Sequence, residues 1–128
     1  VGSEMCIRDS SEHIEKITNL VEGSIIVGHN IINFDWPFLE MEYLRCGIEM
    51  PKPYAIIDTL VLARKFKIDH YGSKKLGSLC EKFGITLERA HSADADAGAT
   101  LLLLWRIMKT YPEKFQTWWD RLDKSISN

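Results

Sequence analysis

The chain has 128 residues, of which 45% are hydrophobic and 27% charged, and its formal net charge is −2. This composition indicates one globular domain, and no apolar run approaches the ~20 residues that cross a membrane. The near-neutral charge gives no global basic field, so any binding to nucleic acid must be local. The three cysteines include no Cys-x-x-Cys pair, which favours ordinary thiols of a cytoplasmic protein over a zinc site or a disulfide framework.

Residues 1–10, VGSEMCIRDS, show no periodicity that leads into the next segment. The run from Met5 to Asp9 resembles a translated transposon-adapter end from a sequencing library. We therefore expect a non-native leader and exclude it from the fold; the alternative is a flexible native N-terminus. On this interpretation the domain occupies residues 11–128 and its authentic start is missing.

Short apolar strands alternate with helices along the rest of the chain. β-Branched, apolar runs predict buried strands at 24–28 and 54–57. The predicted helices, each with apolar positions at helical spacing or a Gly or Pro at its boundary, are 11–22, a helix from about Pro37 to Cys46, 60–66, 76–83, 93–108 and a last helix after Pro112.

This alternation indicates an α/β fold with parallel strands. The helix at 93–108 is apolar on most sides, which predicts a central, well-buried position. Two strands alone form a marginal sheet, so we expect further strands on the N-terminal side.

Two polar segments could carry chemistry: Gly28–Asp35, directly after the first strand, and His91–Ala97, at the start of the apolar helix. Open α/β sheets place their ligands beyond the carboxyl ends of strands. Each residue also has a structural explanation when taken singly. Asp35 and Asp96 could stabilise helix N-termini, and His91 could be a surface or capping residue.

Together the two segments suit metal-dependent phosphodiester hydrolysis. Hard divalent ions such as Mg²⁺ prefer carboxylate oxygens, and two such ions can hold the attacking and leaving oxygens. His91 could take the proton from the attacking water while Asp96, about one turn later, holds metal. Asp94 lies roughly 200° around the helix from Asp96 and should point away from the site.

The order of these segments resembles the DnaQ-like 3′–5′ exonucleases of the DEDDh subgroup, named for four acidic residues and a histidine. Residues 29–35 resemble the second motif of that family, and residues 91–97 match the third, His-x-Ala-x-x-Asp-Ala. The stretch from Asp58 to Ile85 resembles the family's middle section. The resemblance therefore covers about residues 11–111 and implies a ribonuclease H-like α/β fold.

The resemblance also implies roles for individual residues. Asp35 and Asp96 would be carboxylates of a site for two Mg²⁺ or Mn²⁺ ions, and His91 would be the general base. Asp58 would be a supporting acid at the edge of the site, or equally a turn residue at a strand end. Asn30 would shape the pocket.

Other residues near the motifs have simpler explanations. Phe34 could shape the pocket, but a core position fits it better, and His29 is expected to be structural. A basic stretch of the middle section could contact phosphates, although a solvated face explains it more simply. Its residues are Arg64, Lys65, Lys67, Lys74 and Lys75.

The chain departs from the family in one respect: the first motif, Asp-x-Glu, occurs nowhere in it. In that family these two carboxylates bridge the metals and lie on a strand upstream of the helix at 11–22. We therefore expect an incomplete exonuclease domain that lacks the first three strands and is inactive by itself.

The parent protein would hydrolyse single-stranded DNA or RNA from the 3′ end, with a DNA polymerase as a candidate partner and no membrane involved. Two alternatives remain. One is a non-catalytic nucleic-acid-binding module of the same fold, and the other is a single-metal hydrolase that uses only Asp35, Asp96 and His91.

Overall fold

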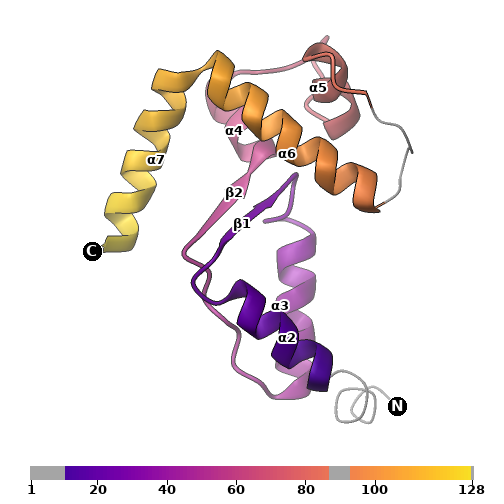
Figure 1. Cartoon of the computed structure of the whole chain (residues 1–128), viewed down its shortest axis with the longest axis vertical. Helices are drawn as coiled ribbons and strands as arrows, with labels where there is room; N and C mark the ends of the chain where they lie inside the picture. Colours follow the sequence, from indigo (N-terminus) through magenta and orange to yellow (C-terminus); the bar gives the residue numbers. More distant parts are fainter. Residues whose placement is uncertain (1–10, 87–92, 128) are drawn as a thin grey trace. The chain divides into compact units, whose positions relative to one another are not determined.

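A computed structural model of the chain describes residues 11–86 and 93–127. Strands β1 and β2 pair side by side as a two-stranded parallel sheet (Figure 1). In chain order the elements are α2 (Ser11–Val21), β1 (Ile25–Gly28), α3 (Asp35–Cys46), β2 (Ala55–Asp58), α4 (Thr59–Phe66), α5 (Leu76–Lys82), α6 (Ala93–Thr110) and α7 (Pro112–Ser127).

The element types and the α/β class expected from the sequence are confirmed, and the predicted ends differ by one or two residues. Local signals explain this agreement. Gly47, for example, ends α3 at a φ of 68°, a left-handed conformation that glycine adopts without strain. Its N–H donates to the carbonyl of Leu44 at 3.1 Å.

The chain divides into two compact units, of which the first comprises Val1–Ile26 and Ile31–Ile56. In this unit Tyr43 of α3 is buried, and its hydroxyl lies 2.6 Å from the hydroxyl of Thr18 in α2. Both hydroxyls also reach the backbone carbonyl of Ile14. A buried polar group must find such partners, so this cluster fixes α3 against α2.

The second unit comprises Val27–Asn30 and Ile57–Asn128 and holds the main hydrophobic core. Helix α6 contacts α4, α5 and α7 (Figure 1), and its Leu103 and Ile107 are completely buried. Arg106 donates from Nη1 to the carbonyl of Phe83 at 3.0 Å, which ties α6 to the end of α5.

The expectation that α6 is buried on most sides is wrong for one of its faces. Four large apolar side chains of α6 are 40–59% exposed: Leu101, Leu102, Trp105 and Met108. In the described part of the chain, α4, α5 and α7 cover the opposite side only. Burial of an apolar helix such as α6 requires neighbouring elements on every face, and a two-stranded sheet does not supply them.

The cysteines also differ from expectation. Cys80 is a buried free thiol, as expected, but Cys46 is disulfide-bonded. No helix in the described ranges has the length and apolar character needed to cross a membrane.

Core burial predicts a difference between two neighbouring leucines of α6. Leu103→Ala should lower the free energy of unfolding by about 2–5 kcal/mol, because it leaves a cavity in the core. Leu102→Ala, the matched control on the exposed face, should change it by only about 0.5 kcal/mol. Urea denaturation of both variants tests this, and equal losses would contradict the one-sided burial of α6.

Candidate functional site

A buried carboxylate joins the two strand ends in the second unit. Asp58, at the end of β2, is 1% exposed. Its Oδ1 accepts the N–H of Asn30 at 2.7 Å and the N–H of Leu60 at 2.9 Å. The first bond fixes the loop after β1, and the second caps α4. Asp58 therefore caps α4 at the end of a strand, and its role as a supporting acid of the site stays a prediction.

Asn30 adopts a φ of 62°, in the left-handed region where asparagine is among the few side chains tolerated. The turn directs its N–H at Asp58. This geometry explains an asparagine at position 30, and a direct role of its side chain in shaping a pocket stays a prediction.

His29 connects β1 to two other segments of the second unit. Its Nε2 lies 3.0 Å from the carbonyl oxygen of Lys74 and its Nδ1 lies 2.7 Å from Oγ1 of Thr59. A carbonyl oxygen only accepts hydrogen bonds, so Nε2 carries a hydrogen, and Nδ1 of the neutral ring accepts the hydroxyl hydrogen of Thr59. This arrangement gives His29 the structural role expected from the sequence.

The environment of His29 favours the neutral ring. Burial lowers its pKa below the ordinary value of 6.5, and the Lys74 carbonyl and the Asp58 carboxylate offset this only in part. A histidine held neutral and hydrogen-bonded through both nitrogens is suited to fixing a backbone rather than to moving protons.

The three expected catalytic residues occupy different parts of the chain. Asp35 is the first residue of α3 in the first unit, and its side chain is exposed. Asp96 lies in the first turn of α6 in the second unit and is half-buried. His91 and the side chain of Asp94 lie outside the described residues. The convergence of Asp35, Asp96 and His91 on one cleft stays a prediction.

Asp96 lies near α5. Burial, and to a smaller degree the negative charge of Asp96, raises the pKa of the Cys80 thiol. The backbone carbonyl of Asp96 accepts the hydroxyl of Thr100 at 2.7 Å, one turn later. This contact belongs to the helix, so it leaves the carboxylate available for other interactions.

The prediction that Phe34 belongs to the core is wrong. Phe34 precedes α3 and is 68% exposed, because it lies in the turn before the helix, outside the core of either unit. Its exposure keeps the pocket-shaping interpretation open.

The basic residues of the middle section are mostly solvated. Arg64, in the last turn of α4, is exposed and favourably placed for the helix dipole. Lys75 precedes α5 and is exposed, whereas Lys74 is half-buried. Contact of these residues with phosphates stays a prediction.

Asp35 and Asp96 would offer carboxylate oxygens to a metal ion. Carboxylates are the ligand type that Mg²⁺ and Mn²⁺ prefer. Among residues 11–86 and 93–127, no three histidine, cysteine or acidic side chains lie close enough together to hold an ion. Asp35 and Asp96 therefore fit these ions in type, but further donors are needed.

A family model described as "Exonuclease" matches residues 4–104. The chain belongs to this exonuclease family. The family confirms the DnaQ-like resemblance, and the two-stranded α/β structure agrees with an incomplete ribonuclease H-like fold. The match begins inside residues 1–10, and the non-native origin of those residues stays a prediction.

Several similar curated proteins are DNA polymerases of one type. A DNA polymerase III PolC-type from Listeria innocua is 42% identical over 89 residues, or 70% of this chain. Proteins of the same name from Pediococcus pentosaceus and Halalkalibacterium halodurans are 39% and 34% identical, over 81% and 88% of the chain. The aligned regions make up only 6–8% of these relatives. No solved structure gives a significant match.

Sequence reasoning missed two partners of His29. Thr59 and the Lys74 carbonyl lie 30 and 45 residues further along the chain, and no spacing rule connects such positions. The one signal in the sequence was the position of the histidine directly after an apolar strand, because a histidine that is buried there needs partners for both ring nitrogens.

Substitutions at Asp58 test whether its side chain stabilises the fold as a hydrogen-bond acceptor. Asp58→Ala leaves two backbone N–H groups without their acceptor and should lower the free energy of unfolding by about 1–3 kcal/mol. Asp58→Asn keeps an oxygen acceptor and should be much closer to the wild type. If urea denaturation shows equal losses for both variants, the negative charge rather than the cap is essential.

The lowered pKa of His29 predicts that acid destabilises the chain. The unfolded chain binds a proton at this residue more readily than the folded chain. The stability contribution is therefore present above the ordinary pKa of 6.5 and is lost as the pH falls toward the lower pKa of the folded state.

Urea denaturation at about pH 7.5 and about pH 5.5 measures this loss. His29→Gln should reduce the difference between the two pH values, because glutamine does not titrate. His13→Gln, at an exposed histidine of α2, is the control and should leave the difference unchanged. A pH dependence that survives in His29→Gln contradicts the assignment.

Proposed function

We propose that this chain is part of a metal-dependent 3′–5′ exonuclease that hydrolyses phosphodiester bonds at single-stranded nucleic-acid ends. The observation that carries the proposal is the family match over residues 4–104, which includes both motif segments in their expected order. The relatives are named as DNA polymerases, which favours DNA as the substrate, a DNA polymerase as the partner and the cytoplasm as the location.

Each proposed catalytic residue has one task. Asp35 and Asp96 would hold two Mg²⁺ or Mn²⁺ ions, which would activate water and offset the charge of the phosphate when bound. His91 would accept the proton of the attacking water, since imidazole titrates near neutral pH. Phe34, exposed before α3, would shape the pocket.

We do not propose a catalytic role for Asp58. Its carboxylate already accepts two backbone N–H groups and is buried. It would act on the site only by fixing the loop that leads from β1 toward Asp35.

The roles proposed for His91 and Asp96 can be distinguished in a longer protein that carries the Asp-x-Glu motif. His91→Ala should lower the cleavage rate by about 10²–10⁴-fold and leave metal affinity nearly unchanged, because a base acts on water rather than on the ions. Asp96→Ala should weaken metal binding as well. Calorimetric titration with Mn²⁺ beside a cleavage assay measures both properties, and identical behaviour of the variants would show the role split to be wrong.

The chain by itself should have no significant nuclease activity, because Asp35 and Asp96 are too few carboxylates to hold two ions. The exposed apolar face of α6 also fits a domain from which strands are absent. Incubation of residues 11–128 with a 3′-labelled single strand and Mn²⁺ tests this. Degradation at a rate normal for an exonuclease would show that the domain needs no Asp-x-Glu motif.

A non-catalytic nucleic-acid-binding module is the second candidate, because the chain contains no Asp-x-Glu. The genomic sequence upstream distinguishes the two functions, since an in-frame Asp-x-Glu on a strand favours the enzyme. The number of metal ions bound by the longer protein separates the two-metal enzyme from a single-metal hydrolase.

A further inference from the structure

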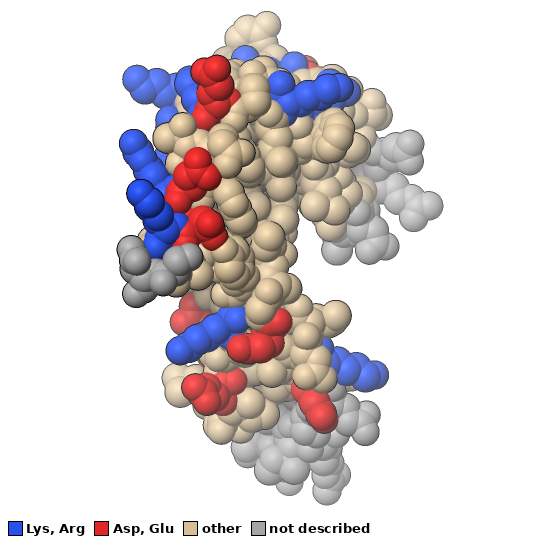
Figure 2. Space-filling model, turned by 60° about the vertical axis from the view of Figure 1, so that its left-hand side comes forward, with Lys and Arg blue, Asp and Glu red and all other residues tan. Residues whose placement is uncertain are grey.

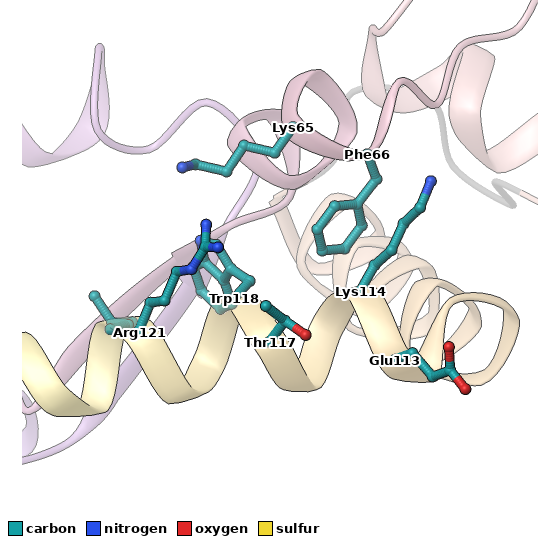
Figure 3. A pocket seen from close by; sticks show the side chains of 8 residues that line it. Lys65, Phe66, Glu113, Lys114, Thr117, Trp118 and Arg121 are labelled. Atoms are coloured by element: carbon teal, nitrogen blue, oxygen red, sulfur yellow. The ribbon is translucent and has the colours of Figure 1, made fainter.

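A pocket of about 720 Å³ lies between α4 and α7 in the second unit. Figure 3 shows Lys65 and Phe66 entering it from α4, and Lys114, Trp118 and Arg121 from α7. None of these residues belongs to the two motif segments, so the pocket is separate from the proposed catalytic residues in the sequence.

The helical spacing of α7 builds one wall of the pocket. Lys114, Trp118 and Arg121 follow one another at intervals of four and three residues, which places them on one face of the helix. The side chains of Lys65, Lys114 and Arg121 are exposed, and Trp118 is half-buried.

The aromatic part of the pocket is held by packing. Phe66 is nearly buried, with its ring centroid 6.3 Å from that of Tyr111. The rings of Trp118 and Phe115 are 5.6 Å apart. Lys114 lies with Nζ 5.4 Å from the centre of the Tyr111 ring, a cation–π contact that positions its charge. The packed rings of Phe66 and Trp118 therefore have little freedom to lose when a ligand binds there.

The charge of the pocket is locally positive in a chain whose net charge is −2. Among the lining residues that the structure describes, three carry cationic side chains and one, Glu113, carries a carboxylate. Basic and acidic side chains are interspersed on the face shown in Figure 2. The pocket is thus a local site for an anion rather than part of an extended basic field.

We infer that this pocket binds a segment of single-stranded nucleic acid, with its phosphates at Lys65, Lys114 and Arg121 and a base against Trp118. Cations that follow the backbone, combined with an aromatic platform for a base, form the usual surface for single strands. The choice of nucleic acid rests on the proposed function. An acidic protein segment would use the same cations but would have no need of the tryptophan.

Binding of a fluorescein-labelled oligothymidylate to the 128-residue chain, measured by anisotropy in EDTA, tests the inference without cleavage or metal. The double variant Lys65→Glu/Arg121→Glu should weaken binding by at least about tenfold at low salt. It should also reduce the slope of log affinity against log salt by about 1.4, or about 0.7 for each lost phosphate contact. Lys109→Glu, at an exposed lysine of α6 outside the pocket, is the control for net charge.

Two further ligands test whether the pocket recognises a base as well as negative charge. An abasic strand of equal length should bind about 5- to 150-fold more weakly to the wild type, as expected for loss of a stacked base. An oligoglutamate of equal charge should compete poorly. Equal weakening by Lys109→Glu, equal affinity for the abasic strand, or full competition by oligoglutamate would each overturn the inference.

The assay also separates this inference from the proposed function. Loss of strand binding in the double variant would stand even if the longer protein does not cleave nucleic acid. Cleavage by the longer protein would equally stand if the pocket proves not to bind the strand.

Discussion

The Asp58 carboxylate is the constraint on which the arrangement of the second unit depends. A buried charge is costly unless hydrogen bonds replace the water that it loses. Here the replacements are two backbone N–H groups, one from the loop after β1 and one from the first turn of α4. The same carboxylate therefore fixes where the segment Gly28–Asp35 leaves the sheet and where α4 begins.

Most of the fold could be predicted because its signals are local. A β-branched run ends at Gly28, and Gly47 and Pro112 mark helix boundaries that the structure confirms. The one-sided burial of α6 could not be predicted in this way. Periodicity reports which faces of a helix are apolar, but it does not report how many of those faces have neighbours to cover them.

The candidate site was predictable only in part. The motif segments were found from the order of their polar residues, and the family match includes both. Phe34 was placed in the core because of its residue type, yet it is exposed in a turn. The pairing of His29 with Thr59 joins residues that are 30 positions apart, so only the three-dimensional structure reveals it.

The hydroxyl of Thr59 has a single hydrogen but two acceptors within reach. The ring nitrogen of His29 is 2.7 Å away, and the carbonyl oxygen of Gly28 is 3.3 Å away. While the imidazole is neutral, the hydrogen goes to the ring. When the imidazole gains a proton, its nitrogen becomes a donor and the hydroxyl must turn to Gly28. One proton therefore reverses the direction of a hydrogen-bond chain at the end of β1, directly before the segment that leads to Asp35.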